Sequence, residues 1–286
     1  MALRLGAHMS IGGSIDLSID RALEKGCNTI QIFTRNPRGW KSEKLNSFAV
    51  DNFILKVRDS GVSPVFSHMP YLPNLASPRE EVYLKSKETL KSELERCRIL
   101  KIPYLVTHCG SHLGRGSEYG IARITEAINE AFMDTKGEVV LLLENTSGSK
   151  NSMGNSFENL AKIYGNIKKK NRIGFCFDTC HAYVAGYDLK TAGAVSTTLE
   201  KFDDKIGTGK IKLIHLNDSK KGLGSKVDRH EHIGLGMIGE KGFKAILSNS
   251  IINELPLILE TPIDSRRDDV GNINRVKALA SSLGVI

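Results

Sequence analysis

Residues 173–183 read IGFCFDTCHAY, a mostly apolar run that ends at Asp178 and is followed by His181. Short apolar runs of this kind are typical of strands that are buried on both faces of a parallel sheet. The polar end of this run admits three interpretations, because Cys176 and Cys180 stand on either side of the aspartate. It could be a cysteine metal site, a redox pair, or a carboxylate–histidine site beside two structural cysteines.

Seven more apolar runs resemble this one, and successive runs start 26 to 44 residues apart. Each interval has room for a helix, as a right-handed crossover between parallel strands requires. The pattern predicts a single-domain (β/α)8 barrel, the TIM barrel, over residues 1–286, with an active site at the carboxyl ends of the strands. An open doubly wound sheet is disfavoured, since no Gly-x-Gly-x-x-Gly follows the first run. The other runs are LRLGAHM from residue 3, TIQIFT from 29, PVFSHM from 64, YLVTHC from 104, VVLLLEN from 139, IKLIHLND from 211 and LPLILET from 255.

Helices are expected in the intervals. Ser77, Pro78 and Glu80 have the spacing of an N-cap, a first helical residue and a capping-box glutamate. A second helix is predicted directly after Ser156, where apolar residues recur at helical spacing. Residues 217–240 contain five glycines and no apolar period, which predicts a long loop, and loops of this length in compact domains are usually functional.

Polar residues stand at the end of every predicted strand. All eight histidines lie at such an end or in the loop that follows it, and we expect none of them on a helix. So many polar groups on one face of a barrel need partners, and imidazoles and carboxylates together suit zinc, manganese or iron. In the loop, Asp228 and His230 have the i, i+2 spacing that could let them share an ion, and His232 continues it. The strand ends are His8, Thr34, His68, His108, Glu144, Asp178, His215 and Glu260.

The five cysteines form no C-x-x-C pair. This argues against a disulfide framework and a thiolate zinc site, and it suits a reducing compartment. Cys176 precedes Asp178 by two residues, so it could share that residue's side of the strand but lie deeper in the barrel. We therefore interpret Cys109, Cys176 and Cys180 as packing residues beside a carboxylate–histidine site.

The composition is that of an ordinary globular protein, with 40% hydrophobic residues and a formal net charge of +8. The amino-terminal sequence shows no signal peptide, and no apolar run approaches the ~20 residues of a membrane span, so we expect a cytoplasmic protein with no membrane partner. The positive charge could be a solvated surface or could attract a polyanion such as nucleic acid, and charge alone does not decide between them.

The motifs closely resemble those of the endonuclease IV family, zinc-dependent apurinic/apyrimidinic endonucleases within the xylose-isomerase-like barrels. The resemblance covers nearly the whole chain, and its most specific stretches are FDTCHAYVAGYD and VDRHEHIGLG. One departure is Cys109, which stands where a proline commonly follows the ligand histidine. The other matching stretches are GAHMSIGG, FTRNPRGW, SHMPYLPNL, LLLENTSG, HLNDSK, GSKVDRHEHIGLG and PLILETP.

The resemblance implies three zinc ions held by nine ligands, with Glu144 as a bridge between two ions; manganese could occupy some positions. It also implies that Glu260 and Glu144 serve in catalysis. The ligands would be His68, His108 and Glu144 for the first ion, Glu144, Asp178, His215 and Glu260 for the second, and His181, Asp228 and His230 for the third.

The same resemblance implies a monomeric DNA-repair enzyme that acts on double-stranded DNA with abasic sites. Cleavage 5′ to the lesion would leave a 3′-hydroxyl and a 5′-deoxyribose phosphate, and blocked 3′ ends would be trimmed by the same site. Arg38, Tyr71 and Leu72 match residues that enter the duplex at the lesion.

Two alternatives remain at this stage. A metal-dependent sugar isomerase on the same barrel would account for the carboxylate-rich set around Glu144, but not for the additional histidines. A non-catalytic binder of damaged DNA would be expected to have lost ligands, and all nine positions are filled.

Overall fold

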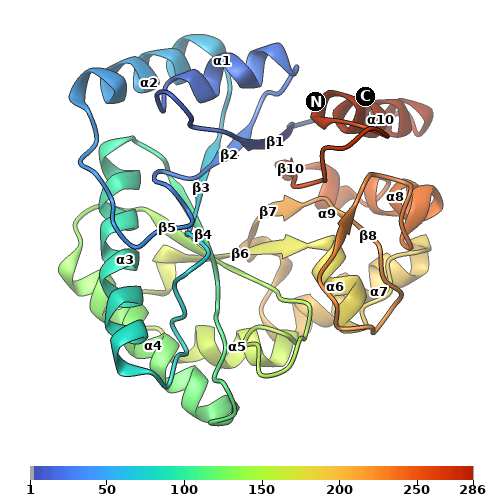
Figure 1. The fold of residues 1–286 in the computed structure, drawn as a ribbon. Coiled ribbons are helices and arrows are strands. Elements are labelled where there is room, and N and C mark those ends of the chain that lie inside the picture. The colour runs from blue at the N-terminus through green and yellow to red at the C-terminus, as the bar shows by residue number, and fades with distance from the viewer. Residues whose placement is uncertain (1–2, 286) are drawn as a thin grey trace.

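The computed structural model describes residues 3–285, and its centre is a closed barrel of eight parallel strands (Figure 1). Around the barrel the strands follow chain order, and β1 closes the ring by pairing with both β2 and β10. All eight predicted strands are present. They are β1 (Leu5–Met9), β2 (Ile30–Ile32), β3 (Val65–His68), β4 (Tyr104–His108), β5 (Val140–Glu144), β6 (Ile173–Asp178), β7 (Ile211–His215) and β10 (Leu257–Leu259).

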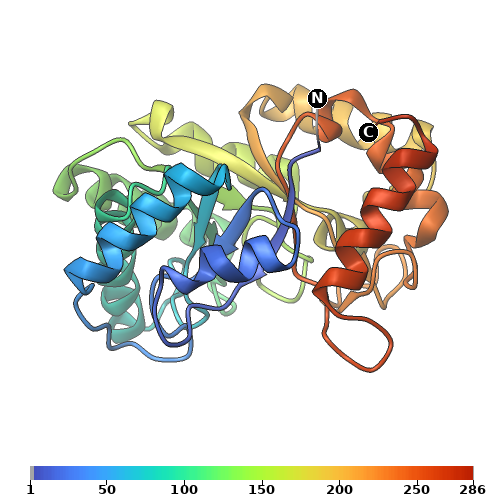
Figure 2. The same ribbon diagram turned by 90° about the horizontal axis from the view of Figure 1, so that it is seen from above.

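Helices cover the outside of the barrel (Figure 2), which confirms the predicted (β/α)8 architecture. Among the described residues, no helix is both long enough and apolar enough to cross a membrane. The helices are α1 (Leu17–Glu24), α2 (Ser47–Ser60), α3 (Glu80–Ile99), α4 (Ser117–Asp134), α5 (Phe157–Asn166), α6 (Thr179–Ala185), α7 (Ala192–Lys205), α8 (Gly239–Leu247), α9 (Ser250–Asn253) and α10 (Asp269–Ser282), with 3-10 turns at Lys170–Arg172 and Thr208–Lys210.

Two apolar layers hold the barrel together. The larger layer lies between the strands and the helices, and the smaller one fills the barrel interior. Each of six strands contributes one residue to the interior, so side chains rather than solvent occupy it. Cys176 lies in this layer, two residues below Asp178, as the sequence predicts. The interior residues are Phe66, Val106, Leu142, Cys176, Leu213 and Ile258.

The two predicted helix starts have different outcomes. Ser156 is the N-cap of α5, and its side chain accepts a hydrogen bond from the Asn159 N–H. The prediction for α3 is wrong by two residues. The Ser77 hydroxyl accepts from the Arg79 N–H in a short turn, and the helix begins at Glu80. A serine side chain stabilises such a turn as readily as a helix start.

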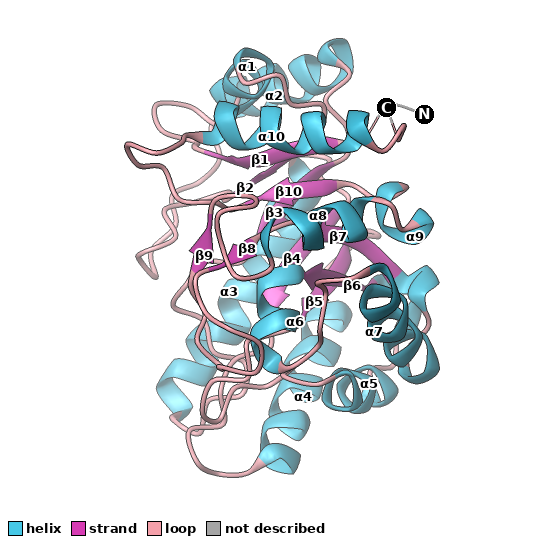
Figure 3. Cartoon of the chain, turned by 90° about the vertical axis from the view of Figure 1, so that its right-hand side faces the viewer, coloured by secondary structure: helices cyan, strands magenta, loops and turns pink. Residues whose placement is uncertain are grey.

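The segment 217–240 is more ordered than the predicted loop. Its two short strands, β8 (Asp218–Ser219) and β9 (His230–Glu231), pair in antiparallel fashion on the side of the barrel where the long loops gather (Figure 3). The buried Asp218 carboxylate accepts hydrogen bonds from the backbone N–H groups of Gly234, Gly236 and Ile238. These bonds fold the segment back on itself and bring His230 toward the barrel mouth.

Candidate metal centre and DNA-contact rim

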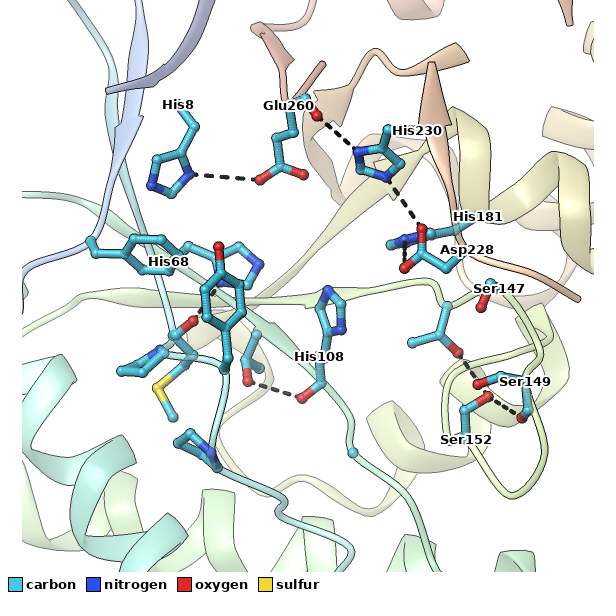
Figure 4. A pocket seen from close by; sticks show the side chains of 18 of the residues that line it. His8, His68, His108, Ser147, Ser149, Ser152, His181, Asp228, His230 and Glu260 are labelled. Carbon is cyan, nitrogen blue, oxygen red and sulfur yellow. Dashed lines mark hydrogen bonds and ion pairs between the residues drawn. The ribbon is translucent and has the colours of Figure 1, made fainter. Parts of the chain in front are cut away.

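A cavity of about 720 Å³ opens at the carboxyl ends of the strands. Figure 4 shows its histidine and carboxylate side chains, together with a serine-containing loop at one side. The barrel places the ends of different strands around one opening, so residues far apart in the sequence meet there. Residues in its wall include His8, His68, Tyr71, His108, Ser147, Ser149, Ser152, His181, Asp228, His230, Glu260 and Ile263.

Glu144 is fully buried at the centre of the cluster, surrounded by four imidazoles. Its Oε2 lies 3.2 Å from His68 Nε2 and 3.0 Å from His108 Nε2. Its Oε1 lies 3.1 Å from His215 Nδ1 and 3.3 Å from His181 Nδ1. Burial raises the pKa of the Glu144 carboxyl, but His108 and His215 outweigh it and hold that pKa well below its ordinary value.

Two of the predicted ligand sets meet around this carboxylate. His68, His108 and Glu144 form one group whose donor atoms all lie within 4.8 Å of one another. A second group with ligand atoms equally close together consists of Glu144, Asp178, His215 and Glu260. Within it His215 Nδ1 lies 3.3 Å from Glu260 Oε2. The structure therefore brings together the residues that the resemblance assigns to the first and second ions.

His181 lies on a helix, so the expectation that no histidine is helical is wrong. Helix α6 begins directly after β6 with no intervening loop. The Asp178 side chain is its N-cap and accepts through Oδ1 from the His181 N–H at 2.7 Å. The other carboxylate oxygen, Oδ2, accepts from Asn217 Nδ2 at 2.8 Å and faces His215.

The third predicted set is adjacent but is not a single group. Asp228 Oδ2 lies 3.0 Å from His181 Nε2, and Asp228 Oδ1 lies 3.5 Å from His230 Nε2. The compact groups are instead Asp178 with His181 and His230, and Cys180 with Asp228 and His230. His232 lies apart from these groups. Its ring nitrogens bond Asp264 Oδ1 and Asn272 Nδ2, so its share in an ion site is not supported.

The hydrogen bonds of the histidines fit metal binding. In three of them one ring nitrogen is bonded to a backbone carbonyl oxygen. Because a carbonyl oxygen can only accept a hydrogen bond, that ring nitrogen carries the proton. In a neutral ring the opposite nitrogen then carries no proton, and in each of these histidines it faces a carboxylate oxygen. Two acceptors at 3.0–3.5 Å need a cation or proton between them, and this arrangement of ligand and outer hydrogen bond is usual for metal-binding histidines. The pairs are His68 with Met69 O, His181 with Asn145 O, and His230 with Glu260 O.

The strand ends of β1 and β2 differ from the others. His8 lines the cavity with Nδ1 3.7 Å from Glu260 Oε1, although no role was assigned to it. Thr34 points away from the cavity and donates to Glu93 on α3, so its expected place at the site is wrong. Because sides alternate along a strand, Phe33 and Gln31 face the other way. Gln31 bonds Glu260 directly, and sequence reasoning missed it.

The predicted DNA-contact residues lie on two neighbouring loops beside the cavity. The backbone N–H of Tyr71 donates to Pro37 O, next to the exposed Arg38. Tyr71 is 67% exposed and lines the cavity, and Leu72 is 39% exposed. Ile263, which the sequence analysis did not single out, is 68% exposed in the cavity wall. Large apolar side chains held in solvent at a cavity rim are typical of contact surfaces.

The cysteines are buried next to the cluster. Burial raises the pKa of the Cys109, Cys176 and Cys180 thiols to about 12. Cys176 and Cys180 are nevertheless close enough to ligand-type atoms to join a metal group. The interpretation of these cysteines as packing residues therefore stays a prediction that mutation can test.

We expect Cys109→Ser, Cys176→Ser and Cys180→Ser to retain bound metal and activity, with some loss of stability because a hydroxyl replaces a buried thiol. Carboxylates and imidazoles already supply the donor groups. Elemental analysis and thermal unfolding of each variant check this, with Cys97→Ser on α3 as a buried control remote from the cavity. Stoichiometric loss of metal from any of the three would instead make that thiolate a ligand.

A family model described as a xylose isomerase-like TIM barrel matches residues 19–285, which defines the class to which the fold and site belong. A protein of Methanoculleus marisnigri named probable endonuclease 4 is 54% identical over 279 residues, 97% of this chain and 99% of its own length. The chain belongs to the endonuclease IV family.

A solved structure agrees with this assignment. Endonuclease IV from Thermus thermophilus superposes with a TM-score of 0.86 at 33% identity, covering 98% of this chain and 99% of the other. A D-tagatose 3-epimerase-like protein, 20% identical, superposes with a TM-score of 0.73 over 99% of both chains. At that identity the likeness shows the fold alone.

Proposed function

We propose that the protein is a DNA-repair hydrolase that cleaves the phosphodiester 5′ to abasic sites in double-stranded DNA, leaving a 3′-hydroxyl and a 5′-deoxyribose phosphate. The same site would trim blocked 3′ ends. The observation that carries the proposal is one cavity that combines a buried cluster of histidines and carboxylates with exposed apolar residues at its rim. The high identity to proteins named endonuclease 4 supports it.

Three ions are proposed at the cluster, zinc by preference, with manganese possible. His68, His108 and Glu144 would hold the first, and Glu144, Asp178, His215 and Glu260 the second. His181, Asp228 and His230 would hold the third after a small rearrangement of Asp228, which is half exposed. Bound divalent ions supply Lewis-acid stabilisation of the charge that develops on the phosphate.

The chain's own residues would position the reactants. Glu260 lies at the end of β10 with its carboxylate between His8 and His215, where it could orient an attacking water and take its proton. Glu144 holds four imidazoles in a fixed arrangement, so little reorganisation is needed during the reaction. Glu144, Asp178 and His215 are fully buried, so bulk water does not reach these three side chains.

Recognition of the lesion would come from the rim. An abasic nucleotide has no base to unstack, so rotating it out of the duplex costs little free energy. Tyr71 and Leu72 would fill the resulting gap, as apolar wedges do in other DNA-bending proteins, and Arg38 would contact the backbone beside them. The positive net charge of the chain favours association with DNA of any sequence.

Tyr71→Ala and Arg38→Ala are expected to weaken binding of abasic duplex more than binding of intact duplex, because they act at the lesion while phosphate contacts are sequence-blind. Competition binding with both duplexes measures the ratio. Phe48→Ala and Arg58→Ala on α2 are matched controls, since both are exposed and neither lines the cavity. An equal loss of affinity for the two duplexes would show that Tyr71 and Arg38 contact only the DNA backbone and do not recognise the lesion.

The direct test is incision of a duplex with one defined abasic site, with metal content measured on the same sample. We expect cleavage on the 5′ side and about three metal ions per chain. A fully metal-loaded protein that leaves the duplex intact would refute the proposal, and a reproducible single equivalent of metal would favour sugar isomerisation. Monomeric behaviour in sedimentation and a location inside the cell, where the DNA is, remain predictions.

A further inference from the structure

A single side chain from β2 connects two residues of the candidate metal centre, His215 and Glu260, with the neighbouring His8. Gln31 lies between Ile30 and Ile32 in the strand and is fully buried. Its carboxamide oxygen lies 2.8 Å from His215 Nε2. Its nitrogen lies 2.7 Å from Glu260 Oε1 and 3.0 Å from His8 Nδ1.

The orientation of this amide follows from its partners. An ionised carboxylate only accepts hydrogen bonds, so the NH₂ group must face Glu260 and the oxygen must face His215. The amide oxygen can only accept, so His215 carries a proton on Nε2. His215 Nδ1 is thereby directed, as the ligand atom, toward Glu144 Oε1 at 3.1 Å and Glu260 Oε2 at 3.3 Å.

His215 differs in this respect from the other histidines whose outer nitrogen is bonded. His68, His181 and His230 rely on backbone carbonyls, whose positions the fold determines. The outer bond of His215 depends on a side chain that mutation can remove. The same side chain uses its two N–H bonds on Glu260 and His8.

We propose that Gln31 is a positioning residue that fixes the ligand nitrogen of His215 and the carboxylate of Glu260 at once. Groups of this kind typically change metal affinity or activity by ~10–100-fold when they are removed. The proposal rests on the proposed function, abasic-site incision, only for its expected effect on kcat. Its metal-binding part stands on the contacts of Gln31 alone.

Two variants and one control separate the acceptor and donor roles of Gln31. Gln31→Leu has a similar size and loses both the acceptor and the donors. Gln31→Glu keeps an acceptor for His215 but replaces the NH₂ group with a second carboxyl oxygen, which either repels the Glu260 carboxylate or shares a proton with it, and in both cases the N–H donor to ionised Glu260 is lost. Thr29→Val removes a partly buried hydrogen bond on the same stretch and serves as the control, because the Thr29 hydroxyl donates to Pro64 O and not to a residue of the centre.

In Gln31→Leu we expect zinc affinity, measured by competition with a chelator, to fall ~10–100-fold. The hydrogen-bonded Nε2–H proton of His215 in the NMR spectrum of the zinc-loaded protein should be lost. In Gln31→Glu that resonance should persist and zinc affinity should fall less. In both variants kcat for abasic incision should fall ~10–100-fold with KM little changed, and Thr29→Val should match the unaltered protein.

Other outcomes would overturn the proposal. These are a folded Gln31→Leu with unaltered zinc affinity and an unaltered His215 resonance, or a Gln31→Glu with unaltered kcat. Thermal unfolding reports whether each variant folds. If Gln31→Leu does not fold, Gln31→Glu, which keeps the size of the side chain, still tests the proposal through its kcat. A wild-type protein that binds zinc but does not incise abasic DNA would refute the proposed function. The zinc and NMR measurements would then still test Gln31.

Discussion

Glu260→Gln is expected to slow incision by ~10²–10⁴-fold, the usual loss for a positioned proton-transfer group, while affinity for abasic duplex stays near normal. Glutamine keeps the size of the side chain and one ligating oxygen but removes the charge. The metal cluster can survive because Glu144 and the histidines remain, whereas the attacking water loses its orienting carboxylate. The contacts with Gln31 and His215 also hold the Glu260 carboxylate in a fixed position, and the amide of the substituted glutamine would not reproduce both contacts.

The measurement is single-turnover cleavage beside equilibrium binding on the same duplex. Glu158→Gln on α5, a glutamate outside the cavity, is the control. Cleavage by Glu260→Gln near the wild-type rate would show that Glu260 has no catalytic role. Complete loss of bound metal would show that Glu260 acts only as a structural ligand.

Glu144→Gln should have a still larger effect. The carboxylate contacts four imidazoles and belongs to both of the compact metal groups described around it. Removing a central member of a catalytic unit can cost as much as removing the whole unit, so we expect incision to fall by more than ~10⁴-fold. We also expect metal content to fall by about two ions, since each of these two groups loses its shared charge.

Stability offers an independent measurement of the same change. Metal that binds only the folded chain stabilises it by about 4 kcal/mol when its concentration is a thousand times the dissociation constant. Chelator should therefore lower the unfolding temperature of the wild type clearly and that of Glu144→Gln much less. Full metal content and normal chelator sensitivity in Glu144→Gln would contradict the bridging role.

The fold could be predicted from sequence because all eight barrel strands are buried on both faces and appear as short apolar runs. The positions of most residues of the candidate site could be predicted as well, because polar residues such as Glu144 and Asp178 end those runs. The resemblance supplied the grouping of the ligands.

Other features depend on side-chain direction, which a sequence does not display. Thr34 stands at an apparent strand end, but β2 stops at Ile32 and the threonine faces α3. Gln31 is hidden within an apolar run and has no motif around it. His181 is helical because Asp178 ends a strand and caps a helix at the same point, and no turn residue marks the junction.

That junction also makes the start of α6 mechanically dependent on the candidate metal centre. One oxygen of Asp178 holds the first turn of the helix, and the other faces the imidazoles across the barrel mouth. A rotation of the carboxyl group that improves one contact must disturb the other, because the two oxygens move as a rigid unit. Strand β6, helix α6 and the candidate metal centre are therefore coupled through the Asp178 side chain, and no loop residue lies between the strand and the helix to absorb a change in the occupancy of the centre.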